Sequence, residues 1–377
     1  MPYIKTITVF CAALVSSLIL TPIIARFALK INFVDSPSGK KVHAKPTPLL
    51  GGVAIYFSFI FAISLTVKAD RALLASLVGG TVIMVIGIID DRFKLIPRLK
   101  LLAQFIAAII TIMMGVQVAF IKIPFLSMVF TCLWIVGMTN AFNLIDNING
   151  LCAGIAAIAS FFFGVLAFIN GNFVLAATSF ALMGSALGFL RYNFPKANIF
   201  MGDAGSMFLG FMLASIAVAG SWKTSSLTTS LAIPILILGY PIFDVTFVTV
   251  MRMMEGRPVS MGGKDHSSHR FAIAIMESIM RSRGKNNSKG TKLIPAIVTF
   301  AKGLRTKGED RVLNRLAASG FKKKRGVLML YGLSFALGLA ALGMTVLGRY
   351  FDWGIMIITL ILTLLFGIRL GRVRSNG

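Results

Sequence analysis

Acidic residues are scarce in this chain. It holds 13 aspartates and glutamates against 38 lysines and arginines, and charged residues make up only 14% of the sequence. Soluble domains carry about 25% charged residues, so the composition excludes an ordinary soluble globular protein. Cysteine is also rare. The 3 cysteines lie in apolar runs at unrelated spacings, which favours small buried side chains over a disulfide or a thiolate metal site.

Apolar residues dominate instead. They make up 56% of the chain, and the mean hydropathy is +0.85. One membrane crossing needs roughly 20 apolar residues, and uncharged runs of that length recur. The sequence therefore predicts an all-α polytopic membrane protein with about eleven transmembrane helices. The candidate spans are 6–29, 49–67, 72–89, 99–116, 127–145, 149–169, 173–190, 204–222, 230–250, 327–348 and 353–370.

The basic residues indicate how the chain is oriented. A net charge of +25 would suit a nucleic-acid-binding protein, but most lysines and arginines fall in loops on one side of the predicted spans. The positive-inside rule then places the N-terminus outside and the C-terminus in the cytoplasm. We expect the basic excess to face anionic lipid, with the membrane rather than nucleic acid as the partner.

With this topology, most acids lie in cytoplasmic loops or at cytoplasmic helix ends. Asp90 and Asp91 end the third span, and Lys94 follows them. A carboxylate pair there costs free energy through desolvation and mutual repulsion. A bound metal ion or phosphate would justify that cost. An ordinary helix end with an Asp–Lys pair is the alternative.

Further cytoplasmic loops carry polar residues of the same kind. Asn140, Asn143 and Asp146 recur at spacings of three, which aligns their oxygens along one face of a helix. Such oxygens suit a hard cation that retains water ligands. Asp203 precedes the eighth span among small residues that allow a ligand close to the backbone. As a helix N-cap it would have a purely structural role.

Two basic segments could meet phosphate groups. Lys41 and His43 lie in the first cytoplasmic loop, which could equally be an ordinary positively charged loop. His266, His269 and Arg270 lie in the long loop that follows the ninth span. A zinc site is disfavoured because no cysteine or further histidine is near. We interpret this segment as one that closes on a pyrophosphate.

Together these motifs resemble those of the polyprenyl-phosphate N-acetylhexosamine-1-phosphate transferases. This is glycosyltransferase family 4, the bacterial enzymes that start O-antigen, teichoic acid and enterobacterial common antigen synthesis, with the MraY translocases as relatives. The resemblance covers residues 30–270 and 315–350. It rests on four motifs in order: Asp35, His43, Pro48, Gly51 and Gly52; Asp90, Asp91 and Lys94; Asn140, Asn143 and Asp146; Phe200 to Ser206 with Asp203.

The resemblance implies transfer of a sugar 1-phosphate from a UDP-N-acetylhexosamine to undecaprenyl or another polyprenyl phosphate, with release of UMP. It implies a Mg²⁺ cofactor, for which Mn²⁺ could substitute, and a site on the cytoplasmic face of the bacterial inner membrane. By resemblance, the expected roles are metal ligation by Asn143 and Asp203; catalysis by Asp90, Asp91, Asp146, His266 and His269; and substrate contacts by Lys41, His43, Lys94, Asn140, Asn149 and Arg270.

The chain departs from the family pattern in two places. Asn149 stands where the family usually has aspartate, and about 45 residues are inserted after Arg270. The insertion could lie on the inner leaflet, dock on a partner or a second copy, or be a tolerated solvated segment, so a homodimer stays open. We divide the chain into a catalytic transmembrane core (1–250), a basic cytoplasmic loop with the histidine motif (251–326), and two last spans with a tail (327–377).

Two other functions compete with the transferase. A catalytically weakened or silent relative with a scaffold role would explain Asn149 and the insertion. A secondary transporter would place charges near mid-membrane in paired repeats, whereas the acids here gather at helix ends. The sequence does not identify the sugar. The patterns at Asp265 to Arg270 and at Tyr331 to Ser334 resemble the GlcNAc-type branch of the family, and this resemblance disfavours a MurNAc-pentapeptide donor.

Overall fold

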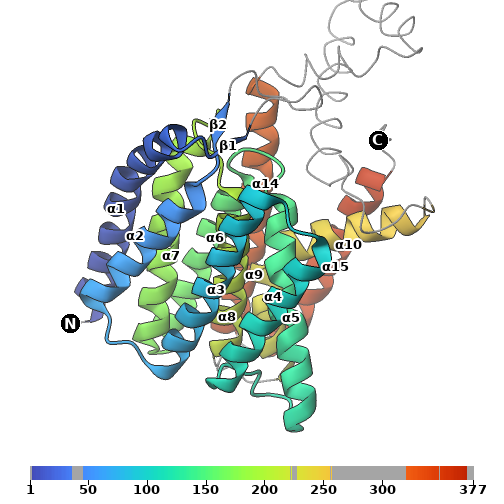
Figure 1. The fold of residues 1–377 in the computed structure, drawn as a ribbon. Helices are drawn as coiled ribbons and strands as arrows, with labels where there is room; N and C mark the ends of the chain where they lie inside the picture. The colour runs from blue at the N-terminus through green and yellow to red at the C-terminus, as the bar shows by residue number, and fades with distance from the viewer. Residues whose placement is uncertain are drawn as a thin grey trace, which may run out of the picture.

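The computed structural model describes residues 2–35, 46–220, 222, 227–254, 256, 320–347 and 349–371. These residues form a bundle of roughly parallel and antiparallel helices (Figure 1). The helices are α1 (Pro2–Lys30), α2 (Gly51–Thr66), α3 (Arg71–Phe93), α4 (Pro97–Met113), α5 (Pro124–Ile145), α6 (Leu151–Ile169), α7 (Phe173–Asn193), α8 (Gly202–Ala219), α9 (Leu227–Ile237), α10 (Gly239–Met254), α14 (Gly320–Leu347) and α15 (Arg349–Gly371).

The fold is helical, as predicted, with one small addition. Two short strands, β1 (Val34–Asp35) and β2 (Thr47–Pro48), pair in an antiparallel ladder after α1. Backbone bonds extend this contact, because Phe200 N donates to Pro48 O and Gly51 N donates to Phe200 O. The start of α2 is thereby tied to the loop that precedes α8.

Helix α8 forms the centre of the bundle. About 78% of its apolar window is buried, against 28% for α1 at the periphery. It packs against α2, α3, α5, α6 and α7. Small residues allow these close approaches: Gly87 of α3 lies against the backbone of Ala204, and Gly210 of α8 lies against the backbone of α5. Small residues at helix contacts are typical of membrane bundles, where burial from water does not drive association.

Seven of the described helices are long and apolar enough to cross a membrane, and a bent pair would make eight. All eleven predicted spans fall on described helices, but the count of eleven crossings and the orientation of the termini stay predictions. One span differs from its prediction. The range 230–250 is not one straight helix, because α9 and α10 meet at a bend of 75°. Gly239 and Pro241 follow the break, and proline lacks the N–H that would continue the helix.

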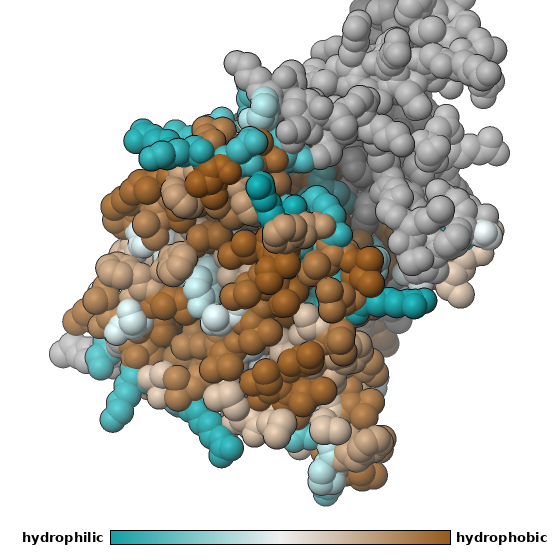
Figure 2. All heavy atoms as spheres, in the orientation of Figure 1, coloured by the Kyte–Doolittle hydropathy of each residue, from teal (hydrophilic) through white to brown (hydrophobic). Residues whose placement is uncertain are grey.

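The surface agrees with a membrane setting. Figure 2 shows hydrophobic side chains covering the middle of the visible face, with hydrophilic ones gathered toward its two ends. Part of the predicted machinery lies outside the described residues. This holds for Lys41, His43, His266, His269, Arg270 and the insertion after Arg270.

Candidate active site

Four helix ends meet at one end of the bundle. We call this the site end, formed by the last turns of α3 and α5 and the first turns of α4 and α8, and we call the opposite end the far end. At the centre of the site end lies the ammonium group of Lys100, from α4. Its Nζ lies 2.8 Å from Asp90 Oδ2, 2.7 Å from Asp203 Oδ2 and 3.2 Å from Asn143 Oδ1. A cation therefore sits among three oxygen ligands from three different helices.

Asn143 and Asp203 are also joined directly. Asn143 Nδ2 donates to Asp203 Oδ1 at 2.9 Å and to Ser206 Oγ at 3.0 Å. The amide nitrogen is thus occupied by α8, which leaves the amide oxygen facing the cation. The structure brings together the two residues predicted as metal ligands, and it orients an oxygen from each of them toward the same point.

The two adjacent aspartates of α3 have different contacts. Asp91 Oδ1 accepts the backbone N–H of Asp203 at 2.8 Å, and its Oδ2 accepts that of Ala204 at 3.2 Å. The first N–H groups of a helix lack intrahelical partners, so Asp91 caps α8 from another helix. The alternative of Asp203 as the N-cap is wrong. Met201 precedes α8, and Asp203 is the second helical residue.

Gly202 makes this contact possible. Its φ of +75° is a left-handed conformation that favours glycine. A Cβ atom at this position would collide with the carboxylate of Asp91 and the backbone of Leu49. The small residue that the sequence places before Asp203 therefore serves close packing of α3 against the start of α8.

Asp90 organises the turn between α3 and α4. Its Oδ1 accepts the backbone N–H of Leu95 at 2.8 Å, while its Oδ2 faces Lys100. Lys94 ends α3 in a left-handed conformation, with φ of 55° and an exposed side chain. This turn brings Lys100 back over the end of α3. Lys94 itself lies at the rim, where a phosphate could reach it.

Asn140 lies apart from the oxygens around Lys100. Its Nδ2 donates to Gln104 Oε1 at 2.5 Å and to Val136 O at 2.8 Å. Gln104 follows Lys100 by one turn of α4, so the Asn140–Gln104 pair forms the next layer into the bundle. Asn140 and Asn143 thus share the face of α5 that meets α4, as expected, but Asn143 contacts Lys100 whereas Asn140 contacts Gln104 one turn further along.

Asp146 ends α5 and is half-buried beside the cluster. Burial raises the pKa of this carboxyl well above its usual range, and the nearby carboxylates of Asp203 and Asp91 raise the pKa further. Asn149, also half-buried, lies in the same loop. The structure thus places the loop of residues 146–150, which we call the third-motif loop, next to the residues around Lys100.

The residues present fit a hard cation. No group of three histidine, cysteine or acidic side chains that could hold a metal occurs in the part of the chain that the structure describes. The oxygens of Asn143 and Asp203 instead form a set of amide and carboxylate ligands, which Mg²⁺ prefers together with water and substrate phosphates. That these oxygens already surround an ammonium group shows that the position favours positive charge.

Two residues of this site, Lys100 and Gln104, were absent from the sequence prediction. Lys100 contacts Asp203, 103 positions away, and Gln104 contacts Asn140, 36 positions away. One signal could have found Lys100. It is the last charge before the apolar run of α4, and charges within membrane helices usually face a partner inside the bundle.

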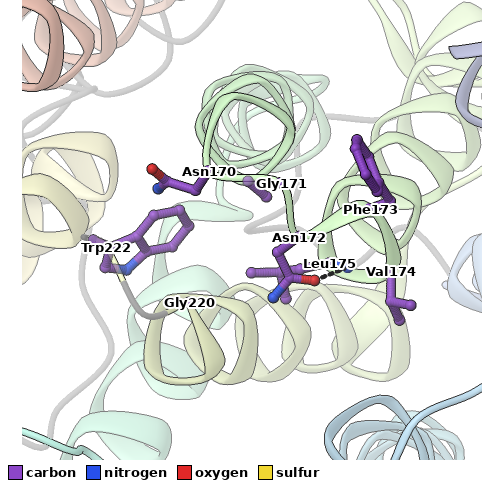
Figure 3. Close-up of a pocket in the computed structure, with 9 residues that line it drawn as sticks. Asn170, Gly171, Asn172, Phe173, Val174, Leu175, Gly220 and Trp222 are labelled. Atoms are coloured by element: carbon purple, nitrogen blue, oxygen red, sulfur yellow. Dashed lines mark hydrogen bonds between the residues drawn. The ribbon is translucent and has the colours of Figure 1, made fainter. Parts of the chain in front are cut away.

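A cavity of about 520 Å³ lies elsewhere, at the far end. Figure 3 shows its lining, with Asn170 and Gly171 at the end of α6, Asn172 to Leu175 at the start of α7, and Gly220 and Trp222 after α8. Asn172 Oδ1 accepts the backbone N–H of Leu175 at 3.0 Å. None of the described residues that line this cavity is ionisable. It is separated from Asp203 by the length of α8.

Comparison with known proteins identifies the family. The family model described as glycosyl transferase family 4 matches residues 73–221, a range that includes Asp90, Lys100, Asn143 and Asp203. A relative from Bacillus subtilis (strain 168), named probable undecaprenyl-phosphate N-acetylglucosaminyl 1-phosphate transferase, is 40% identical over 278 residues. The match covers 71% of this chain and 77% of the relative. The chain belongs to the polyprenyl-phosphate N-acetylhexosamine-1-phosphate transferase family.

Other relatives show the breadth of this family. The decaprenyl-phosphate N-acetylglucosaminephosphotransferase of Mycobacterium leprae (strain TN) is 31% identical, covering 67% of this chain and 73% of its own. A phospho-N-acetylmuramoyl-pentapeptide-transferase from Caldicellulosiruptor bescii is 32% identical, covering 57% of this chain and 74% of its own. Membership in this transferase family confirms the predicted resemblance. The roles of individual residues stay predictions.

Proposed function

We propose that this chain transfers N-acetylhexosamine 1-phosphate from a UDP-sugar to polyprenyl phosphate and releases UMP, in a reaction that requires Mg²⁺. The observation that carries the proposal is the set of Asp90, Asn143 and Asp203 oxygens around the Lys100 ammonium at the site end. The names of the relatives support a polyprenyl phosphate acceptor and favour N-acetylglucosamine as the sugar. We further propose that the site faces the cytoplasm of a bacterial cell membrane.

The chemistry needs little proton transfer. An oxygen of the acceptor phosphate attacks the phosphorus atom that carries the sugar. The bond from this phosphorus to the bridging oxygen breaks, and UMP leaves with the electron pair. A phosphomonoester has a second pKa near 6, so much of the acceptor is already a dianion at neutral pH. A general base from Asp90 or Asp91 is therefore not required.

The larger barrier is repulsion between two anionic substrates. Preorganised positive charge at the reacting centre lowers this barrier. Lys100 supplies one such charge, held in place by carboxylates of α3 and α8. Asn143 and Asp203 would hold Mg²⁺, which when bound neutralises the phosphate oxygens of the donor. Lys94 at the rim would meet a phosphate that arrives from the surface.

The donor nucleotide would lie toward the third-motif loop. Asp146 and Asn149 border the cluster and offer a carboxyl and an amide for hydrogen bonds. Lys41, His43, His266, His269 and Arg270 are proposed substrate contacts that lie outside the described residues. A homodimer stays a proposal of the same kind.

The direct test uses purified protein with polyprenyl phosphate, Mg²⁺ and a panel of UDP-N-acetylhexosamines. We expect release of UMP with at least one donor, and loss of this release when EDTA removes the metal. The Asp203→Asn variant, which keeps the shape of the side chain but loses a charge, serves as the inactive control. No UMP with any donor would contradict the proposal.

A silent relative with a scaffold role is the second candidate, because Asn149 replaces the usual family aspartate. Substituting Asn149→Asp separates the two. Activity that appears only in the Asn149→Asp variant would favour the silent relative. Activity in the unchanged chain excludes it.

A further inference from the structure

Two loops adjoin two acids of the site, Asp146 and Asp203, and the spacing of these loops must be fixed for both acids to meet one donor molecule. The third-motif loop, residues 146–150, joins α5 to α6 and carries Asp146. The fourth-motif loop, residues 194–201, joins α7 to α8 and leads into Asp203. Neither loop has regular secondary structure that would hold it against the other.

Asn193 connects these two loops through the two ends of its amide. Its Oδ1 accepts the backbone N–H of Gly150 at 2.6 Å, and its Nδ2 donates to the backbone carbonyl of Ile199 at 2.8 Å. The side chain is buried, with only 3% of its surface exposed. A buried amide with both ends satisfied specifies one arrangement of its partners, because an unpaired end would cost a desolvation penalty.

Tyr331 of α14 holds the next peptide group, the one that follows Gly150. Its hydroxyl donates to the carbonyl oxygen of Gly150 at 2.5 Å. The tyrosine ring fills the space over Gly154, where a Cβ atom would collide with the ring. The ring also lies 6.1 Å from that of Phe194, measured between centroids.

Gly150 is suited to this double contact. Its φ is +80°, and a Cβ at this position would come within 2.7 Å of the Phe194 side chain. A residue other than glycine would be strained here and would separate the two loops. The N–H of Gly150 is thus held by Asn193 of α7, and its carbonyl is held by Tyr331 of α14.

We propose that Asn193 and Tyr331 are positioning residues that set the spacing between Asp146 and Asp203, and with it the affinity for the donor. The inference rests on the proposed function, in which the third-motif loop meets the nucleotide and the fourth-motif loop meets its phosphates. Neither residue contacts the Lys100 cluster through a bond that the structure shows. Their effect on the reaction passes through the loop backbone.

The test compares kinetics in matched variants. Tyr331→Phe removes one hydroxyl and keeps the ring, so it should raise the KM for the UDP-sugar about 3- to 10-fold, the equivalent of one hydrogen bond. Asn193→Ala leaves two backbone groups without a partner and should raise this KM about 10- to 100-fold. The KM for polyprenyl phosphate should stay within about twofold in both variants.

Two controls separate positioning from general stability. Tyr192→Phe also removes a tyrosine hydroxyl that donates to a backbone carbonyl, that of Leu18 at 2.9 Å. Asn172→Ala removes an asparagine that accepts a backbone N–H at the other end of α7. We expect both controls to leave the KM for the donor unchanged. Equal changes in test and control variants, or a larger change in the KM for the acceptor, would overturn the proposal.

Hydrogen exchange gives a readout that does not depend on activity. The amide of Gly150 should exchange slowly in the unchanged protein and faster in Asn193→Ala, whereas the amides of the α3–α4 turn should not change. Unchanged exchange at Gly150 would overturn the inference. If the unchanged protein shows no UMP release with any donor, the proposed function fails, and the exchange result still decides whether Asn193 fixes the loop.

Discussion

The two ends of the bundle use polar side chains in different ways. At the far end, Asp70 and Asn172 each accept a backbone N–H three residues ahead in the same helix. At the site end, Asp91 accepts N–H groups of a helix more than a hundred residues away, and Lys100 joins α3, α5 and α8. Local caps need no other segment of the chain, whereas the site end exists only once the bundle is assembled.

The two ends also differ in that the far end holds the cavity and the site end holds the charged cluster. Among the described residues, those that line the cavity at the far end carry no ionisable group (Figure 3), whereas the site end gathers carboxylates around a cation. Buried charge indicates a functional site better than cavity volume does. Burying a charged group costs free energy, so such a group persists where a binding partner compensates for that cost. The following substitutions test whether the two ends differ in this way.

The largest effect is expected for Asp203→Asn. The amide keeps the shape but cannot neutralise Lys100 or hold a divalent cation with the same strength. The rate of UMP release should fall about 100- to 1,000-fold, as for the loss of a preorganised electrostatic contact. Asp70→Asn is the matched variant at the far end and should keep the rate within about twofold. Similar losses in both variants would remove the distinction between the ends.

Lys100→Met should lower the rate about 100-fold. It removes the only cation seen between the carboxylates of Asp90 and Asp203 among the described residues, and it leaves those carboxylates to repel each other and the substrates. Lys122→Met changes an exposed lysine at the far end and serves as the control. A Lys100→Met protein as active as this control would contradict the role assigned to Lys100.

Asp91→Ala and Asp70→Ala should differ in activity but not in stability. Each removes a helix cap, so each should lower the free energy of unfolding by about 1 kcal/mol. Only Asp91→Ala also frees the start of α8, which carries Asp203, and its rate should fall about tenfold. Denaturant unfolding in detergent and UMP release are measured on the same preparations. Equal rates of UMP release in the two variants would show that Asp91 acts only as a structural helix cap.

The smallest expected effect is a change in how the stability of the protein depends on pH, and it involves Asp146. The folded protein holds the pKa of Asp146 well above its usual range through burial and the carboxylates of Asp203 and Asp91. The burial of Asp146 therefore costs stability in full above its folded pKa, and this cost shrinks as the pH falls below the folded pKa until it vanishes below the unfolded pKa of about 3.9.

Asp146→Asn should accordingly stabilise the protein at neutral pH while it lowers the rate about tenfold. The gain in unfolding midpoint should shrink as the pH falls toward the ordinary aspartate pKa of about 3.9. Unfolding midpoints measured across this range decide the matter. A gain that grows at low pH, or no gain at neutral pH, would contradict the environment described for Asp146.

Sequence reasoning reached the local features of this fold and missed the remote ones. Apolar runs of sufficient length indicated the helices. Asn143 and Asp203, expected to share one cation, do lie together around Lys100, while metal binding by them stays a prediction. The bend at Leu238 was missed because the hydropathy of 230–250 is continuous across it. Hydropathy averages do not register the missing N–H of Pro241.

The contacts of Asp90 and Asp91 could not be read from their adjacency. Successive residues on a helix point in directions about 100° apart, so one carboxylate reaches Lys100 and the other reaches the backbone of α8. Which carboxylate reaches Lys100 and which reaches α8 depends on the orientation of α3 about its own axis relative to α8. That orientation is set by the packing of Gly87 on Ala204, a contact between distant segments that no local pattern encodes.

We propose that the cluster around Lys100 performs phosphoglycosyl transfer. The direct test is mass spectrometry of the lipid product, with purified protein, polyprenyl phosphate, UDP-N-acetylglucosamine and Mg²⁺. We expect a polyprenyl diphosphate that carries one N-acetylhexosamine, formed by the unchanged chain and reduced at least about 100-fold in Asp203→Asn. Equal amounts of this lipid from both proteins would contradict the proposal.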